Sequence, residues 1–220
     1  MASYQTVLFD LDGTLIDSVD LIVDSYLHTF EVHRVPAWTR EEILSGLGTP
    51  LRVAFGKIAR DAAEIDAWIA TYRAYNLAHH DERVRAYPGT VEMVHQLKAA
   101  GRRLGLVTSK NRSGAERGLN LVGLAGTMEV IVGADDVVNP KPHPEPVHRA
   151  LEQLGAAAAT CVFVGDSRHD IHAGRSAGVA TAGVTWGPFD RRHLEAAAPD
   201  HYCDSPEELL ALAGCPVPVR

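Results

Sequence analysis

The spacing of hydrophobic residues changes character along the chain. Residues 6–9 form a short apolar run, which predicts a buried β-strand. Between residues 16 and 85, apolar residues such as Tyr26 and Phe30 recur at helical spacing. This segment is predicted to contain helices, including one over residues 18–32 and a longer one over residues 63–78, and no strands.

Beyond the turn at residues 87–89, predicted strands and helices alternate. The expected strands cover residues 104–107, 129–132, 160–164, 179–184 and 201–203. The expected helices cover residues 91–100, 114–122, 144–154 and 171–177, followed by one that Ser205 opens. This alternation is typical of an α/β fold in which helices cover both faces of a parallel sheet.

The two patterns predict two domains. Residues 1–15 and 86–220 are expected to form the α/β core, and residues 16–85 an inserted helical domain. Because the insertion follows the first strand, we expect it to lie over the C-terminal edge of the sheet as a cap.

Composition and charge limit the classes of function. The chain has 220 residues, of which 46% are hydrophobic, and this is enough for a sizeable core. A net charge of −7 without a basic cluster argues against a general nucleic-acid binder. The three cysteines are scattered and form no Cys-x-x-Cys motif, as is typical of a reducing compartment. We recognise neither a signal peptide nor an apolar run of about 18 residues, so we expect a cytoplasmic protein without a membrane partner.

Polar residues gather where the predicted strands end, and parallel strands bring these ends to one edge of a sheet. The candidates are Asp10 and Asp12, Thr108 and Ser109, Lys141, and Asp166 with Asp170. The first two aspartates face the same side of an extended chain, and close carboxylates repel unless a cation or a shared proton intervenes. The pair therefore indicates a divalent metal, an acid/base pair, or both.

A phosphoryl group would use all of these residue types together. A lysine and a hydroxyl group neutralise and orient its oxygens, and Mg²⁺ takes one or two carboxylates directly. A further carboxylate can attack phosphorus, and a neighbouring one can protonate the leaving oxygen. The expected partner is a small phosphorylated molecule, and the expected cofactor is Mg²⁺.

The motifs resemble those of the haloacid dehalogenase superfamily of phosphohydrolases. They are Asp-x-Asp-Gly-Thr-Leu at residues 10–15, Thr108, Lys141, and Gly-Asp-x-x-x-Asp at residues 165–170, in that order. All four motifs in order, with a helical insertion between the first two, are highly specific. The resemblance covers nearly the whole chain and implies a Rossmann-like parallel sheet with an inserted α-helical cap of the C1 type.

The resemblance also implies roles for the carboxylates. Asp10 would form an aspartyl-phosphate, and Asp12 would be the general acid and then the base. The metal ligands would be Asp10, Asp166 and the backbone carbonyl of Asp12. Asp170, with Gly165 in the same motif, would support the site by orienting the metal's waters or Lys141. Since a halide leaving group needs no proton, Asp12 also favours phosphoryl chemistry over dehalogenation.

The phosphate would be held by Thr108, Ser109, Lys141 and backbone N–H groups. The loop from Gly46 to Arg52 resembles the cap loop of phosphoglycolate phosphatases and inorganic pyrophosphatases in this superfamily. Arg52 is accordingly a candidate for binding a second anionic group of the substrate. Phosphoglycolate and pyrophosphate are the favoured substrates.

Two other functions stay open at this stage. A sugar phosphomutase would use the same aspartyl-phosphate, and a receiver-type signalling domain also surrounds a phosphoryl group with Asp, Thr and Lys. The Gly165-Asp166 motif and the helical insertion argue against the receiver. The eleven histidines show no zinc signature, so surface or packing roles are expected for them.

Overall fold

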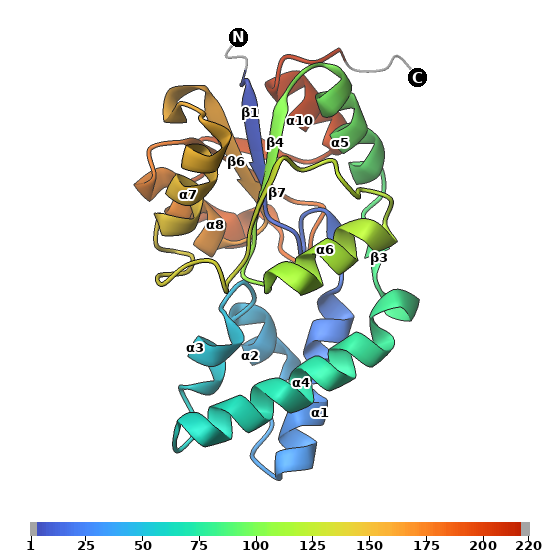
Figure 1. The fold of residues 1–220 in the computed structure, drawn as a ribbon, viewed down its shortest axis with the longest axis vertical. Helices are drawn as coiled ribbons and strands as arrows, with labels where there is room; N and C mark the ends of the chain where they lie inside the picture. The colour runs from blue at the N-terminus through green and yellow to red at the C-terminus, as the bar shows by residue number, and fades with distance from the viewer. Residues whose placement is uncertain (1–3, 217–220) are drawn as a thin grey trace. The chain divides into compact units, whose positions relative to one another are not determined.

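The computed structural model describes residues 4–216, which divide into two compact units (Figure 1). The core unit contains the described residues up to Asp17 and from Arg85 onward, and the helical unit is Ser18–Val84. No helix in the described part of the chain is both long and apolar enough to span a membrane.

The core unit is built on a parallel sheet of six strands in the order β5-β4-β1-β6-β7-β8. Their bounds are Thr6–Phe9 for β1, Arg103–Val107 for β4, Val130–Val132 for β5, Cys161–Gly165 for β6, Ala180–Val184 for β7 and His201–Cys203 for β8. β1 is entirely buried and lies between β4 and β6. The predicted α/β fold with a parallel sheet is confirmed.

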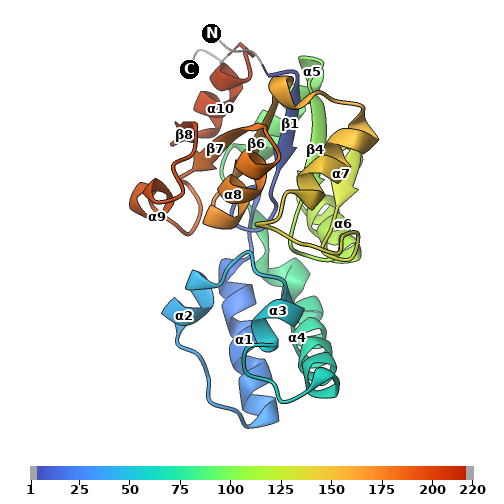
Figure 2. The same ribbon diagram turned by 90° about the vertical axis from the view of Figure 1, so that its left-hand side faces the viewer.

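Helices cover both faces of this sheet (Figure 2). α7 (Glu145–Leu154) and α8 (Arg168–Ser176) lie on one face, and α5 (Thr90–Ala99) and α10 (Pro206–Leu212) lie on the other. α6 (Arg112–Leu121) contacts β5, α9 (Arg191–Glu195) contacts β7, and a single 3₁₀ turn, Ala158–Thr160, precedes β6. The Pro residues predicted to begin α7 occupy its N-cap and first turn, where a missing N–H costs little.

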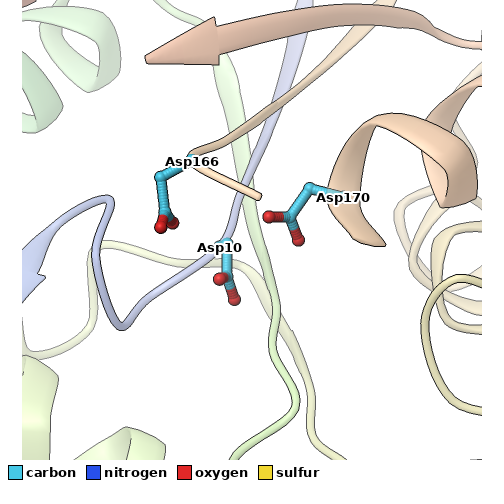
Figure 3. Close-up of side chains that lie close together, drawn as sticks. All are labelled: Asp10, Asp166 and Asp170. Carbon is cyan, nitrogen blue, oxygen red and sulfur yellow. The ribbon is translucent and has the colours of Figure 1, made fainter. Parts of the chain in front are cut away.

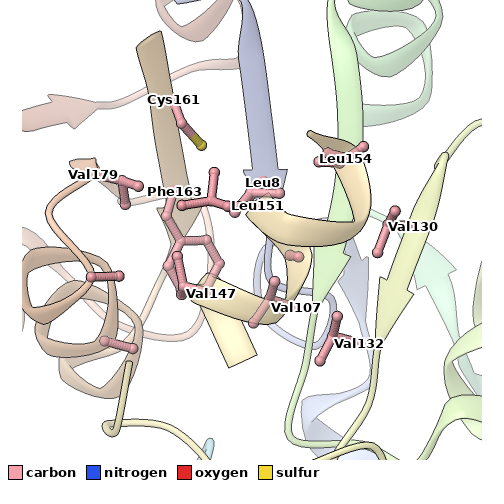
Figure 4. Packing of buried hydrophobic residues seen from close by; sticks show 13 residues of the cluster. Leu8, Val107, Val130, Val132, Val147, Leu151, Leu154, Cys161, Phe163 and Val179 are labelled. Carbon is pink, nitrogen blue, oxygen red and sulfur yellow. The ribbon is translucent and has the colours of Figure 1, made fainter. Parts of the chain in front are cut away.

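Apolar side chains of β1, β4, β5 and β6 pack beneath α7 and α8 (Figure 4). Leu8 and Phe163 from the central strands belong to this cluster and are fully buried, as are Val132 and Val147. Burial of apolar area on this scale is the main stabilising contribution to such a core. It places the C-terminal ends of the strands on a rigid support.

The helical unit contains α1 (Val19–His33), α2 (Arg40–Ser45), α3 (Leu51–Phe55) and α4 (Ala62–Arg83). α1 packs along α4, and an aromatic cluster lies between these helices and α3. Its ring contacts involve Tyr26, Phe30, Trp38, Phe55, Trp68 and Tyr72. The unit therefore has its own apolar centre.

Three local predictions were wrong or incomplete. Residues 16–85 were expected to lack strands, but Ile16–Asp17 (β2) pairs antiparallel with Arg85–Ala86 (β3) at the two ends of this segment. α8 begins at Arg168, three residues before the predicted start, because Ser167 caps it in a capping box. α9 was not predicted, and Asp190 caps this five-residue helix.

Matched valine substitutions test the packing of the core. Val132 is fully buried in the cluster beneath α7, whereas Val138 is 86% exposed. Val132→Ala should lower the free energy of unfolding by about 2–3 kcal/mol, because it removes two buried methyl groups and leaves a cavity. Val138→Ala should change it by less than about 0.5 kcal/mol. Urea unfolding followed by circular dichroism measures both, and equal effects would contradict the packing described here.

Candidate active site

The candidate residues follow three adjacent strands of the sheet. Asp10 follows β1, Thr108 follows β4, and Asp166 lies directly after β6. β1 pairs in parallel with both neighbours, Phe9 lying opposite Leu106 and Val164. The structure therefore brings the three residues to the same C-terminal edge, as the sequence predicted.

Lys141 lies in the segment between β5 and α7 and reaches this edge from one side. Its Nζ donates to Oδ1 of Asp10 at 2.8 Å, to Oδ1 of Asp170 at 2.6 Å and to the carbonyl of Val107 at 3.2 Å. Only 1% of its side chain is exposed. The ammonium is thus fully satisfied and fixed in place between two carboxylates.

Asp170 combines a structural and a site contact. Its Oδ2 accepts from the backbone N–H of Ser167 at 3.1 Å and from the Ser167 hydroxyl at 2.6 Å, which closes the capping box of α8. Its Oδ1 accepts from Lys141. The N-terminus of α8 therefore holds Asp170, and Asp170 in turn holds Lys141. Gly165 makes room for this arrangement, since a Cβ there would lie 2.4 Å from the Asp170 side chain.

Asp166 lies beside Asp10 and keeps one oxygen uncompensated (Figure 3). Its Oδ1 accepts from the Thr14 hydroxyl at 2.8 Å, while its Oδ2 is buried without a hydrogen-bond partner among the described residues. The carbonyl of Thr14 accepts from Nε1 of Trp186 at 2.8 Å, which fixes the turn that carries this threonine. A buried oxygen without a partner is costly, so it marks a place for a ligand.

Two glycines allow the backbone to approach Asp166 closely. Gly13 has a φ of +89°, and a Cβ on it would lie 2.4 Å from Oδ2 of Asp166. A Cβ on Gly187 would lie 2.2 Å from the carbonyl oxygen of Gly13. Side chains at either position would displace the turn that surrounds this carboxylate.

Burial perturbs the acidity of the site. Desolvation raises the pKa of Asp10 to about 7 and outweighs the opposing effect of Lys141, while the charges of Asp170 and Asp12 raise it further. Desolvation also raises the pKa of Asp166 well above its ordinary value, as do the charges of Asp170 and Asp10. Burial opposes the charge of Lys141, but Asp10 and Asp170 outweigh burial and raise the pKa of this ammonium.

The three aspartates fit a divalent cation. Asp10, Asp166 and Asp170 each offer an oxygen atom, and these atoms lie within 4.8 Å of one another. When ionised, the three carboxylates and the ammonium of Lys141 leave two negative charges, which an ion such as Mg²⁺ would balance. Because both oxygens of Asp170 already accept hydrogen bonds, Asp10 and the uncompensated Oδ2 of Asp166 are the better direct ligands. No histidine among the described residues belongs to this cluster.

Asp12, Thr108 and Ser109 lie around this cluster. Oδ1 of Asp12 accepts from Nζ of Lys110 at 2.9 Å. Thr108 is buried, and its hydroxyl accepts from the backbone N–H of Lys110 at 3.1 Å. The Ser109 hydroxyl is buried without a hydrogen-bond partner in the described part of the chain. An uncompensated hydroxyl after β4 suits the binding of a phosphate oxygen.

Arg52 belongs to the helical unit, where it is the second residue of α3. Its guanidinium pairs with Asp66 of α4 in the same unit, and both side chains are exposed. Binding of a substrate anion by Arg52, as predicted, would have to compete with this ion pair.

Several contacts were not recognised in the sequence. Thr14 belongs to the first motif, but its bond to Asp166 spans 152 residues, and that of Trp186 to Thr14 spans 172. No local pattern in the sequence indicates that Lys110 pairs with Asp12. Only the way the strands are ordered in the sheet brings these residues together.

Comparison with known proteins identifies the family. The haloacid dehalogenase-like hydrolase family matches residues 7–184. The chain belongs to this family and is a hydrolase, which confirms the resemblance seen in the motifs.

The chain is also similar to individual members over nearly its full length. It is 43% identical over 209 residues to pyrophosphatase PpaX of Anoxybacillus flavithermus, a match that covers 95% of this chain and 96% of that protein. A haloacid dehalogenase-like hydrolase from Bacteroides fragilis superposes with a TM-score of 0.87 at 27% identity, covering 94% of this chain and 100% of that one. A structure from Lactobacillus plantarum, described as a phosphoglycolate phosphatase, superposes with a TM-score of 0.85 at 27% identity. This match covers 96% of this chain and 99% of that one.

The raised pKa of Asp10 predicts how the stability of the metal-free protein depends on pH. Between about pH 4 and pH 7 the folded state holds a proton on Asp10 that the unfolded state has lost, so stability falls as pH rises. From pH 5 to pH 7.5, the free energy of unfolding should fall by about 2 kcal/mol because of Asp10. Urea unfolding in the presence of a chelator measures it.

The Asp10→Asn variant is the matched comparison for this prediction. It should show a smaller decline over the same pH range, because an amide has no proton to lose. Parallel pH profiles for the two proteins would contradict the assignment to Asp10.

Proposed function

We propose that the protein is a Mg²⁺-dependent phosphohydrolase of small phosphate compounds. The observation that carries this proposal is the buried cluster of Asp10, Asp166 and Asp170 at the C-terminal edge of the sheet, in which Lys141 pairs with Asp10 and Asp170. Membership of a hydrolase family supports the reaction class. Mg²⁺, bound by Asp10, Asp166 and the backbone carbonyl of Asp12, would supply positive charge to the phosphoryl oxygens.

In the first proposed step, a carboxylate oxygen of Asp10 attacks phosphorus. The bond between phosphorus and the leaving oxygen breaks. The leaving oxygen keeps the electron pair of that bond and takes a proton from Asp12. Lys141, Thr108 and Ser109 hold the phosphoryl oxygens. The hydrogen bond from Lys141 to Oδ1 also orients the carboxylate of Asp10 for the attack.

In the second step, Asp12 is ionised and removes a proton from water. The water oxygen attacks the phosphorus of the aspartyl-phosphate, and the bond to Asp10 breaks. Inorganic phosphate leaves, and both carboxyl groups return to their starting protonation states. In each cycle Asp12 thus gives one proton to the leaving oxygen and regains one from water.

Pyrophosphate and phosphoglycolate are the proposed substrates. The relative from A. flavithermus is named a pyrophosphatase, and the structural neighbour from L. plantarum is described as a phosphoglycolate phosphatase. Both compounds carry a second anionic group beyond the scissile bond. That residues 16–85 act as a cap, and that Arg52 binds this second group, stay predictions.

Replacement of the nucleophile should abolish turnover. We expect Asp10→Asn to lower the release of inorganic phosphate from pyrophosphate and phosphoglycolate by at least about 10³-fold, because an amide oxygen is a poor nucleophile. A colorimetric phosphate assay with Mg²⁺ measures this. The control is Asp190→Asn, which changes an exposed N-cap of α9 to another good cap and should leave activity unchanged. Normal turnover by Asp10→Asn would refute the proposed mechanism. With a sugar phosphate as substrate, an isomerised sugar phosphate in place of free phosphate would identify a phosphomutase instead.

Mg²⁺ should stabilise the folded protein through Asp166. At a free concentration one hundred times its Kd, the ion should add about 2.7 kcal/mol to the free energy of unfolding, because it binds the folded state alone. Thermal unfolding with and without MgCl₂ measures the shift, which should be largely absent in Asp166→Asn. Asp190→Asn is again the control, and an undiminished shift in Asp166→Asn would remove this residue from the metal site.

A further inference from the structure

Lys110 places a second ammonium beside the proposed acid. Its Nζ donates to Oδ1 of Asp12 at 2.9 Å, and each of the two side chains is only 15% exposed. The first ammonium, that of Lys141, contacts Asp10 and Asp170 instead. The two lysines therefore pair with different carboxylates of the same site.

The position of Lys110 is built into the core unit. Its backbone N–H donates to the hydroxyl of Thr108, and its carbonyl accepts from the N–H of Ala134 at 2.9 Å. Its aliphatic stem passes over Gly114 of α6, where a Cβ would lie 3.3 Å from both Cγ and Cε of the lysine. Gly114 therefore leaves room for this stem. Anchoring at both backbone groups distinguishes Lys110 from a lysine on a solvated surface.

The pairing with Asp12 fixes where the charge of Lys110 acts. Asp12 is the group that would protonate the leaving oxygen. Only the carboxyl group of Asp12 would therefore separate the ammonium of Lys110 from that oxygen. A leaving group with its own negative charge is attracted to this ammonium while the bond to phosphorus breaks. A neutral alcohol gains only the proton from Asp12.

We propose that Lys110 is a specificity-determining residue that selects substrates with an anionic leaving group. The class includes pyrophosphate, whose leaving group is phosphate, and phosphoglycolate, whose leaving group carries a carboxylate. This inference rests on the proposed function and deepens it. In the step concerned, the bond from Asp10 to phosphorus forms and the bond to the leaving oxygen breaks. The proton on Asp12 passes to that oxygen, and Lys110 keeps its own protons throughout.

The experiment compares leaving groups of matched size. Phosphoglycolate and 2-hydroxyethyl phosphate differ only in a carboxylate against a neutral hydroxymethyl group, and pyrophosphate supplies a second anionic case. In Lys110→Met, we expect kcat/KM to fall by about 100-fold for the two substrates with anionic leaving groups. For 2-hydroxyethyl phosphate, the decrease in kcat/KM should be smaller by a factor of about ten or more. Lys110→Arg keeps the charge and should keep most of the discrimination.

The control is Lys98→Met, which removes a lysine whose ammonium binds the carbonyl of Gly126 in the core unit. Lys98→Met should leave kcat/KM unchanged for all three substrates. It therefore controls for the loss of one positive charge elsewhere in the protein. If Lys110→Met does not fold, as judged by thermal unfolding, Lys110→Gln carries the same comparison.

Two outcomes separate failure of this inference from failure of the proposed function. If wild type releases phosphate but Lys110→Met loses activity equally on all three substrates, Lys110 only holds Asp12 and the inference is overturned. If wild type releases no phosphate from any of them with Mg²⁺, the phosphohydrolase function itself fails.

Discussion

The site depends on burying more negative than positive charge at one edge of the sheet. Asp10, Asp166 and Asp170 cluster beside a single buried ammonium, which pairs with Asp10 and Asp170, and burial raises the pKa of Asp10 and of Asp166. An isolated buried charge is so costly that such a cluster persists only where hydrogen bonds and counter-charges compensate it. Lys141 compensates one side. The uncompensated oxygen of Asp166 lies on the other, and this deficit supports the proposal that the site binds a cation.

The fold tolerates this deficit because each carboxylate is held by a separate piece of structure. Asp170 is fixed by the capping box of α8, while Asp166 is held by Thr14, whose carbonyl is in turn fixed by Trp186. Gly13 lets the first loop pass directly against Asp166. Since these supports come from β1, β6 and the segment after β7, the geometry is set by the whole sheet. Relaxation of any one carboxylate away from its neighbours would break a buried hydrogen bond.

The sequence was sufficient to predict the parallel sheet and the polar residues that gather at its C-terminal edge, since both depend on local patterns. Buried parallel strands are continuous apolar runs, and the polar residues that follow them must share an edge. Contacts set by distant segments were not predictable. The bond of Trp186 to Thr14 and the pairing of β2 with β3 each join residues far apart in the chain. The ion pair of Arg52 with Asp66 likewise depends on how α3 packs on α4, which no spacing reveals.

The order of the strands also separates the charges of the site. Lys110 follows β4 and Lys141 follows β5, whereas Asp10 follows β1 and Asp166 follows β6. In the order β5-β4-β1-β6, both lysines therefore come from one side of the sheet, and the carboxylates proposed to bind the metal come from the centre and the other side. A phosphoryl group over Asp10 would have ammonium groups on one flank and a cation held by Asp166 on the other. Because this polarity arises from topology, changes in the proposed cap would alter the substrate without altering the way in which the phosphoryl group is proposed to be held.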